Sequence, residues 1–508
     1  MRLALLILTA TLASPAVAQQ PPKPPTDSTS KPTPAESSIV TPHQITIDGQ
    51  LVKYSARAGT INLKNDSGVV TASMFYVAYT KDGADARTRP VTFLFNGGPG
   101  SATIWLHMGS IGPVRVTTNE PSFTPPAPYT YGENPSSLLD KTDLVFIDAI
   151  GTGYSRIAGK GTPKDFYGTD GDIKSFADFI VRYITVNNRW NSPKYLFGES
   201  YGTTRAAGLS NALQQRGVAL TGIVLLSSWL NAYVDFGGPP NSLDITFVLY
   251  VPTMAASAWY HHKIPGAPTE LAPILAEARA FALGPYQTAL SKGNKLPDRE
   301  RDSVAALLHR FTGLSEDYIK KSHLRISPAR FEKELLRGEE RTAGGLDARF
   351  TGIDRDAAGE TPDYDPASAA IDAPFTGAFN SYIKSELHWD PGIPYLNFGN
   401  GIESDWDNRH RIGGDLLPLP NVSEDLRQTM SVNPYLRIFS ANGYYDFLTP
   451  FFETEYTFQH MGLDPSLEKN ITYGYYEAGH MMYLHQSVLV QLKKDLAAFY
   501  GGSPGGTK

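Results

Sequence analysis

A serine between two glycines is the residue best placed to do chemistry. The pattern Gly-Glu-Ser-Tyr-Gly at 198–202 follows the apolar run 195–197 and precedes residues 203–215, which predict a helix. A tight turn from a strand into a helix lifts the serine hydroxyl out of a sheet, and the glycines let the backbone close around it. The pattern therefore predicts Ser200 as a nucleophile and the amide of Tyr201 as a donor to an oxyanion.

A serine hydroxyl is a weak nucleophile and needs a base that a third group holds in place. His480 follows the strand-like run 471–476 and is the leading base, while Asp446 follows the run 436–439 and is the leading acid. The chain order Ser, Asp, His is that of α/β-hydrolases. His485 is a competing base, but it falls inside a predicted terminal helix, where a packing or surface role is favoured.

A second loop with unusual chemistry follows the apolar run 91–95. It reads Asn-Gly-Gly-Pro-Gly-Ser at 96–101, and such a corner can present the amide of Gly98 to an oxyanion beside Tyr201. A plain structural turn is the alternative. A phosphate-binding loop is disfavoured because no Gly-Lys-Ser/Thr follows.

Two further clusters contain residue types that can bind a metal. His261 and His262 lack a third ligand in the sequence, and the acidic residues within 354–365 lack the spacing of a calcium loop. We therefore predict surface roles for both clusters, no bound metal and no cofactor.

The elements that position these residues follow from hydrophobic runs. Short, continuous apolar runs at 91–95, 144–147, 195–197, 223–226 and 436–439 predict buried parallel strands, and 172–187 predicts an amphipathic helix. Alternating stretches at 44–47 and 74–79 predict antiparallel strands. Between 231 and 405 helical patterns take over. The expected fold is α/β, of the α/β-hydrolase type, with a central, mostly parallel sheet, helices on both faces and a largely helical inserted lid.

Composition limits the remaining possibilities. The chain has 508 residues, a formal net charge of −6 and no cysteine. It has no basic cluster that favours nucleic acid, and no uninterrupted apolar run long enough to span a membrane. The oligomeric state is not predicted. We expect a signal peptide at 1–18 and a Pro/Ser/Thr-rich disordered linker at 19–42. A hydrolase core at 43–231 and 406–500, a lid at 232–405 and a flexible tail at 501–508 would follow. Such a protein is exported, to a periplasm or to the medium.

Together these motifs resemble the serine carboxypeptidase family, peptidase family S10, in its bacterial secreted form. The resemblance extends over about 92–500 and is weaker in the lid. It includes Asn-Gly-Tyr-Tyr-Asp at 442–446, Gly-His-Met at 479–481, and Asp-Ala-Ile-Gly-Thr-Gly-Tyr-Ser at 148–155, with Ile150 where the family has proline.

The resemblance implies removal of single residues from peptides with a free C-terminus. Ser200 would be the nucleophile, His480 the base and then the acid, and Asp446 its orienting group. The amides of Gly98 and Tyr201 would form the oxyanion hole. The predicted substrate-binding residues are Asn96, Gly97, Glu199, Ser110 and Trp105, of which Ser110 replaces a second glutamate of the family. That replacement keeps open an esterase or a prolyl aminopeptidase-like hydrolase, and a catalytically inactive scaffold is the third possibility.

Overall fold

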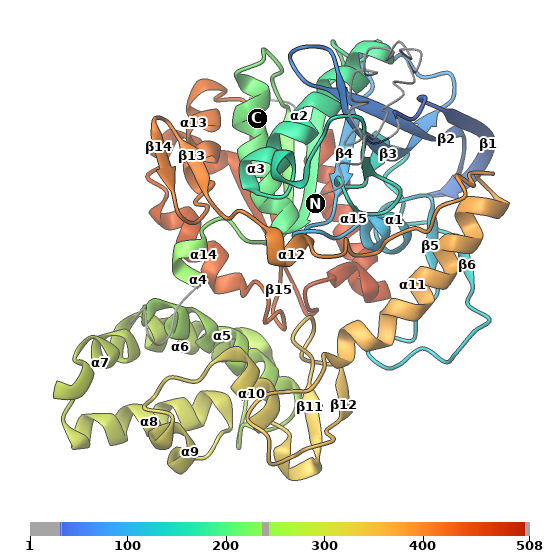
Figure 1. Ribbon diagram of the computed structural model, residues 1–508. Coiled ribbons are helices and arrows are strands. Elements are labelled where there is room, and N and C mark those ends of the chain that lie inside the picture. The colour runs from blue at the N-terminus through green and yellow to red at the C-terminus, as the bar shows by residue number, and fades with distance from the viewer. Residues whose placement is uncertain (1–30, 32, 236–242, 503–508) are drawn as a thin grey trace, which may run out of the picture.

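The computed structural model describes residue 31 and residues 33–235 and 243–502, and its centre is a ten-stranded sheet (Figure 1). The predicted signal peptide and nearly all of the predicted tail lie outside the described residues. In spatial order the strands are β1 (Ser38–Ile47), β2 (Gln50–Lys64), β3 (Val70–Lys81), β7 (Asp143–Ile147), β4 (Val91–Phe95), β9 (Lys194–Ser200), β10 (Gly222–Ser228), β15 (Arg437–Gly443) and β16 (Ile471–Tyr476), and β8 (Arg156–Ile157) pairs with β3.

The sheet changes from antiparallel to parallel along its width. β1, β2, β3 and β7 pair antiparallel, whereas the strands from β7 to β16 run parallel. Every predicted strand is present. β15 begins one residue later than predicted and extends to Gly443, because the polar residues after Phe439 are also buried in the sheet.

The predicted linker is wrong at its end. β1 begins at Ser38, so residues 38–42 form a strand rather than disordered chain. Pro42 argued against a strand before residue 44, because proline has no backbone N–H to donate to a neighbouring strand. β1 is an edge strand of the sheet. It pairs with β2, where Pro42 lies opposite Ser55, and edge strands tolerate proline.

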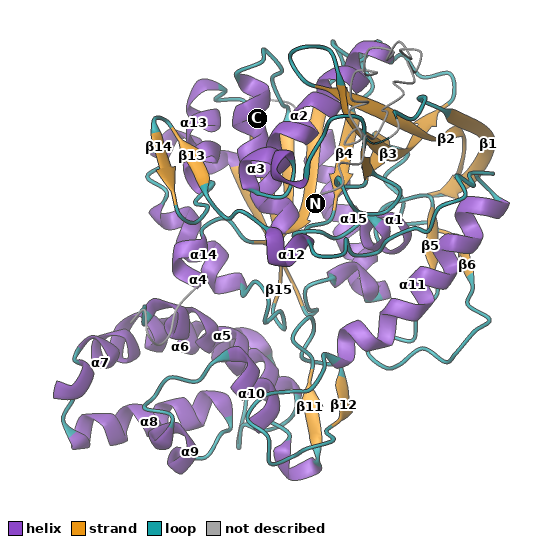
Figure 2. Cartoon of the chain, in the orientation of Figure 1, coloured by secondary structure: helices purple, strands orange, loops and turns teal. Residues whose placement is uncertain are grey.

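Helices cover both faces of the sheet (Figure 2). Side chains of α2 (Thr169–Val186), α3 (Tyr201–Gln214) and α13 (Ser423–Val432) join one hydrophobic cluster, and those of α1 (Ile104–Gly109), α11 (Pro366–Ser385) and α15 (Gln486–Gly501) join another. Phe93 and Phe95 enter the first cluster while Leu94 enters the second, as strand alternation requires. This sheet order with helices on both faces is the predicted α/β-hydrolase fold.

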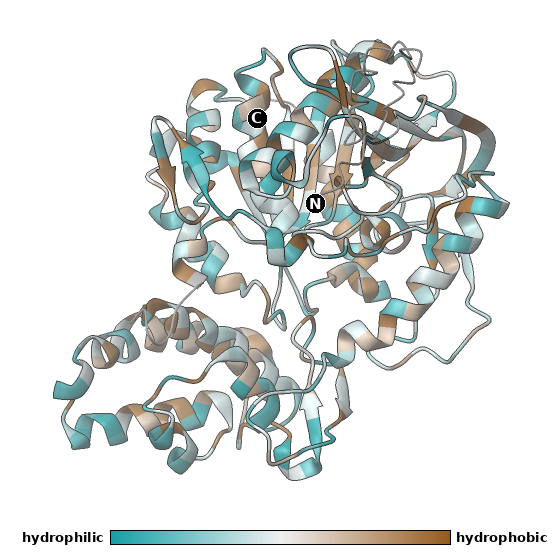
Figure 3. Cartoon of the chain, in the orientation of Figure 1, coloured by the Kyte–Doolittle hydropathy of each residue, from teal (hydrophilic) through white to brown (hydrophobic). Residues whose placement is uncertain are grey.

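A helical block lies beside this core and has its own hydrophobic cluster (Figure 1). It contains α5 (Ile245–Tyr260), α6 (Leu271–Phe281), α7 (Gln287–Ser291), α8 (Asp298–Thr312), α9 (Glu316–Lys321) and α10 (Pro328–Glu334). Helix α8 carries both polar and apolar residues (Figure 3), and it buries Val304, Ala305 and Leu308. Helix α11 lies within the range predicted as lid, yet it packs on the core, so the boundary at 405 stays a prediction.

Short elements complete the described chain. Three two-stranded hairpins are formed by β5 (Val114–Val116) with β6 (Tyr131–Glu133), β11 (Arg341–Ala343) with β12 (Thr351–Ile353), and β13 (His410–Ile412) with β14 (Asp415–Leu417). Three short helices are α4 (Ala232–Asp235), α12 (Ile402–Asp405) and α14 (Phe451–His460). Among the helices of the described residues, none is both long and apolar enough to cross a membrane.

Candidate active site

Ser200 ends β9 and directly precedes α3, at a sharp turn. Its backbone has φ +59° and ψ −133°, a conformation that costs a non-glycine residue free energy. A Cβ atom on Gly198 would lie 2.1 Å from the carbonyl oxygen of Gly202, and one on Gly202 would lie 2.7 Å from that of Phe95. Both flanking glycines are therefore required by close backbone contacts, and the turn holds Ser200 at the carboxyl edge of the sheet.

Asp446 and His480 meet on loops that follow β15 and β16. Oδ2 of Asp446 lies 2.8 Å from Nδ1 of His480, and its Oδ1 accepts the amides of Leu448 and Thr449 at 2.9 and 3.0 Å. Thr449 Oγ1 also donates to Oδ2 at 2.7 Å. This fixed carboxylate favours the imidazole tautomer with a proton on Nδ1, which leaves Nε2 as the basic nitrogen.

The surroundings tune the imidazole. Burial alone would lower the pKa of His480, but the charge of Asp446 and its hydrogen bond outweigh burial and raise that pKa above its ordinary value.

No hydrogen bond joins His480 to the Ser200 hydroxyl in the structure, although the loops after β9, β15 and β16 lie at the same edge of the parallel sheet. Nucleophile and base are often further apart in a free site than in the substrate complex.

The loop after β4 lies directly against the amide that follows Ser200. A Cβ atom on Gly97 would lie 2.4 Å from the Tyr201 nitrogen, so only glycine allows this approach. Gly98 has φ +103°, in the region that favours glycine, and its added Cβ would lie 2.7 Å from the amides of Gly100 and Ser101. The Tyr201 amide opens α3 and has no intrahelical acceptor. The two amides predicted as an oxyanion hole thus belong to two backbone segments that are in contact, the loop after β4 and the start of α3.

Asn96 and Glu199 form a buried pair next to Ser200. Nδ2 of Asn96 donates to Oε2 of Glu199 at 3.0 Å, and Oδ1 of Asn96 accepts the amide of Leu106 at 3.0 Å, which fixes the orientation of the amide. The phenol of Tyr483 donates to the same Oε2 at 2.7 Å. Burial raises the pKa of Glu199 to about 7, so this carboxyl is mostly neutral in mildly acidic solution.

Two predicted pocket residues lie deeper than expected. Trp105 is 2% exposed, packs on Phe375 with ring centroids 5.2 Å apart, and donates its indole N–H to Ser101 Oγ at 3.1 Å. Ser110 is 1% exposed and donates its hydroxyl to the Leu106 carbonyl at 2.5 Å. In this state both side chains support the wall of the site, and their contact with substrate stays a prediction.

Asp148, which opens the motif at 148–155, ties loops around the site together. Its carboxylate accepts the amides of Thr103 and Tyr154 at 2.9 and 3.3 Å and the phenol of Tyr395 at 3.0 Å. Burial raises the pKa of Asp148 to about 6, against the effect of these hydrogen bonds. Asp148 therefore fixes the approach to α1 rather than facing Ser200.

A segment at 345–348, from the range predicted as lid, joins the loops that carry Asp446 and His480. The main chain of the segment bonds to both loops, and the carboxylate of Asp347 accepts the Gly479 amide at 3.0 Å. The backbone bonds are Phe447 N to Gly345 O at 3.0 Å, Ala348 N to Tyr445 O at 3.0 Å, and His480 N to Leu346 O at 2.6 Å. The segment at 345–348 therefore holds these two loops together.

A fully buried arginine supports the sharp turn at Ser200 (the elbow) from the side of α2. Arg205 pairs with Asp172 at 2.7 Å, donates to the Asn96 carbonyl at 2.6 Å, and lies over the ring of Phe176 at 4.3 Å from its centroid. The phenol of Tyr201 bonds to the same aspartate at 3.3 Å. One side chain on α3 therefore links the loop after β4 to α2.

The other sequence candidates lie outside this site. His261 bonds to the Ala348 carbonyl at 2.6 Å. His485 is wrongly predicted as lying within the terminal helix: it caps α15 and bonds to Glu120 at 2.7 Å, because the chain makes a 3-10 turn first. In the acidic loop, Asp354 pairs with buried Lys333 and Asp365 caps α11. No group of three or more metal-ligating side chains was found among the described residues.

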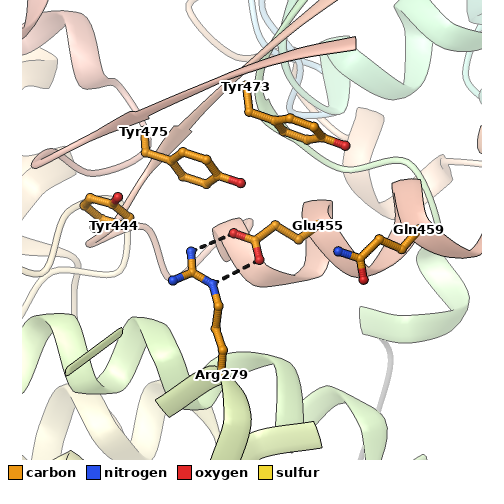
Figure 4. Close-up of a pocket in the computed structure, with 6 residues that line it drawn as sticks. All are labelled: Arg279, Tyr444, Glu455, Gln459, Tyr473 and Tyr475. Atoms are coloured by element: carbon orange, nitrogen blue, oxygen red, sulfur yellow. Dashed lines mark hydrogen bonds and ion pairs between the residues drawn. The ribbon is translucent and has the colours of Figure 1, made fainter. Parts of the chain in front are cut away.

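Away from Ser200, Asp446 and His480, a cavity of about 330 Å³ lies where the helical block meets the core (Figure 4). Arg279 of α6 makes a bidentate pair with Glu455 of α14, at 2.7 and 3.0 Å. Three tyrosines lie close by in near-parallel stacking, and the lining is completed by Gln459. The tyrosines are Tyr444, Tyr473 and Tyr475. The two charged groups pair with each other, so we interpret this cavity as part of the packing between block and core rather than as a ligand site.

Sequence reasoning missed Tyr483, Asp347 and Arg205. Tyr483 stands two residues after the Gly-His-Met motif at 479–481, and that closeness to a candidate base was the available signal. Its phenol reaches Glu199. Asp347 and Arg205 gave no signal, because each acts on a loop far away in the sequence.

Part of the chain is similar to known serine carboxypeptidases. Residues 47–241 match the family model described as serine carboxypeptidase. A relative is the pheromone-processing carboxypeptidase KEX1 of Cryptococcus gattii, 27% identical over 213 residues, which cover 39% of this chain and 29% of that protein. The match thus spans less than a third of the curated relative.

Solved structures with the same kind of fold are distant. The proline iminopeptidase of Mycobacterium smegmatis has 13% identity and a TM-score of 0.36, covering 87% of this chain and 97% of that one. Est816, described as an N-acyl homoserine lactone degrading enzyme, has 12% identity and a TM-score of 0.32, covering 86% and 100%. The fold assignment therefore rests on the sheet itself.

Proposed function

Because residues 47–241 are similar to the serine carboxypeptidase family, we propose that the chain is a serine-type carboxypeptidase acting on peptides with a free C-terminus. One observation supports this activity above the others. Glu199, adjacent to Ser200, is buried beside Asn96, and burial raises its pKa to about 7. A neutral carboxyl can donate a hydrogen bond to a substrate carboxylate, which an ionised one would repel.

In the proposed reaction, His480 Nε2 takes the proton of Ser200 as Oγ attacks the carbonyl carbon of the last peptide bond. The tetrahedral oxyanion accepts hydrogen bonds from the amides of Gly98 and Tyr201. His480 then gives its proton to the leaving amine, and an acyl-enzyme forms. Water, deprotonated by His480, attacks the acyl carbon, and the serine leaves with the returned proton. Asp446 keeps the imidazole in the required tautomer.

The proposal carries a pH dependence. Glu199 is protonated below about pH 7 and ionised above it, so KM for peptides with a free C-terminus rises with pH above that value. His480, whose pKa lies above its ordinary value, must be neutral to act as the base, so kcat falls as the solution becomes acidic. The two groups are coupled, because each charge affects the other.

The decisive experiment compares a peptide with its C-terminal amide at pH 5 and pH 7.5 by mass spectrometry. A ladder from the free acid alone supports the carboxypeptidase, and equal cleavage of both peptides contradicts it. Ser200→Ala should reduce turnover about a million-fold, and Asp446→Asn about ten-thousand-fold. Near wild-type rates in either variant would refute the assignment of the triad.

A second candidate on the same fold is an esterase or a prolyl aminopeptidase-like hydrolase. Ser110 favours it, because the family's second glutamate is missing and the Ser110 hydroxyl bonds to its own helix. Labelling of Ser200 by a fluorophosphonate probe, without a C-terminal ladder from either peptide, would favour this candidate.

The proposed location is outside the cytoplasm, after removal of residues 1–18. Arg2, the apolar run at 3–12 and Ala-Val-Ala at 16–18 support this proposal. Sequencing the N-terminus of the mature protein tests it, with a start near Gln19 as the expected result and an intact Met1 as the contradicting one.

A further inference from the structure

Glu199 is bonded asymmetrically. Its Oε2 accepts two donors, Asn96 Nδ2 at 3.0 Å and the Tyr483 phenol at 2.7 Å, whereas Oε1 has no hydrogen-bond partner among the described residues. The Asn96 amide cannot reverse its roles cheaply, because its Oδ1 accepts the Leu106 amide. Both donors are therefore directed at one oxygen of the carboxyl group.

This asymmetry decides which oxygen carries the proton. A neutral carboxyl has one hydroxyl oxygen, which donates, and one carbonyl oxygen, which accepts. If the proton were on Oε2, one of the two donors to that oxygen would lose its acceptor, and a buried donor left unpaired is unfavourable. The proton of neutral Glu199 therefore belongs on Oε1, which leaves that O–H free to donate.

Packing beside α1 makes room for the tyrosine. The ring of Tyr483 is fully buried, and a Cβ atom on Gly109 would lie 2.7 Å from Cε2 of that ring. The next residue, Ser110, is small and keeps its hydroxyl on the Leu106 carbonyl. The end of α1 thus leaves the space beside Glu199 to a side chain from the His480 loop.

We infer that Tyr483 is a positioning residue for recognition of the substrate's C-terminus: it holds Glu199 Oε2 so that Oε1–H points to the terminal carboxylate. The inference rests on the proposed carboxypeptidase function and names the group that replaces the missing second acid. It also joins recognition to catalysis, because Tyr483 lies three residues after His480, in the 3-10 turn Met482–Leu484 that directly follows the His480 loop.

The choice of a phenol has a consequence for pH. Burial and the nearby Glu199 raise the pKa of Tyr483 well above its ordinary value, so the phenol stays a neutral donor while Glu199 titrates. The other charged groups that act on Glu199 are His480, which lowers its pKa, and Asp446, which raises it. The Tyr483 hydrogen bond lowers the pKa of Glu199, so its removal should raise that pKa further.

The test is Tyr483→Phe, which deletes one hydroxyl. For peptides with a free C-terminus KM should rise about ten-fold at pH 6, the value for one lost hydrogen bond of about 1.4 kcal/mol. The pH at which KM begins to climb should move upward. Hydrolysis of an N-acyl ester without a free carboxylate should change less than about two-fold. Tyr286→Phe, which removes a buried phenol bonded to the Leu324 carbonyl, is the matched control.

If KM and the pH at which it begins to rise are both unchanged in Tyr483→Phe, the inference is overturned and the carboxypeptidase proposal still stands. A wild-type protein without preference for free C-termini would overturn both. If Tyr483→Phe fails to fold, Glu199→Gln decides. Its oxygen would accept from Asn96 and Tyr483, its amide would donate to the substrate without titrating, and KM at pH 8 should be no higher than at pH 6. A persistent climb of KM in Glu199→Gln would refute the inference.

Discussion

Replacing Arg205 by methionine tests whether the buried ion pair behind the elbow holds the loop after β4. Methionine keeps most of the length and the apolar volume, but it removes the charge that pairs with Asp172 and the donor to the Asn96 carbonyl. Both partners are buried, with side-chain exposures of 0% for Arg205 and 4% for Asp172. The substitution therefore leaves Asp172 as an unpaired charge in the core.

The expected loss is about 3–5 kcal/mol in the free energy of unfolding, the range for breaking one partner of a buried pair. Burial already raises the pKa of Asp172, and Arg205 opposes that rise, so Arg205→Met should raise it further. A raised pKa in the folded state means that folding binds a proton, so the variant should recover stability as the pH falls from 7 to 5.

Urea unfolding of four proteins measures the effect: wild type, Arg205→Met, Asp172→Asn and the double variant. The neutral amide removes the orphaned charge, so the double variant should be at least about 1 kcal/mol more stable than the sum of the single losses predicts. Additivity within about 0.5 kcal/mol, or no gain at pH 5 for Arg205→Met, would refute the reasoning. KM for peptides with a free C-terminus should also rise in Arg205→Met, since Asn96 loses its support.

Three further predictions follow from individual contacts. Thr449→Val removes a donor to the carboxylate of Asp446 and should lower kcat about ten-fold with little change in KM, measured on the peptide pair; an unchanged kcat would contradict this role. His410 lies between two aspartates; burial lowers its pKa, but their hydrogen bonds outweigh burial and raise it to about 9. The stability that this histidine contributes, on the order of 2 kcal/mol, should be complete below about pH 6.5 and lost as pH rises through 9, and urea titrations should show no such loss for His410→Gln. Arg279→Ala should separate the helical block from α14, shown by faster proteolysis of the block at an unchanged rate of ester hydrolysis, and Glu455→Gln should do the same more weakly.

Much of the fold could be predicted because its signals are local. Apolar runs of three to five residues predicted the buried strands, and the two glycines flanking the Glu-Ser-Tyr segment predicted the turn at Ser200, since a Cβ at either would clash with backbone. The first half of the edge strand β1, residues 38–43, was missed because of Pro42, and the hairpin β13–β14 was missed because its strands are short and half-exposed. Signals that depend on pairing partners are weaker than those carried within one segment.

By itself the sequence determined the order and types of the residues predicted to react: Ser200, Asp446, His480 and the Asn96 loop. The positions of the strands along the chain and the residue types of the loops are encoded in short segments, because backbone sterics and burial act between near neighbours. Only the tertiary structure decided that the Tyr483 phenol donates to Glu199, and that the segment at 345–348 bonds to the loops that carry Asp446 and His480. Hydrogen bonds across hundreds of residues depend on how helices and loops pack, and no local pattern records that packing.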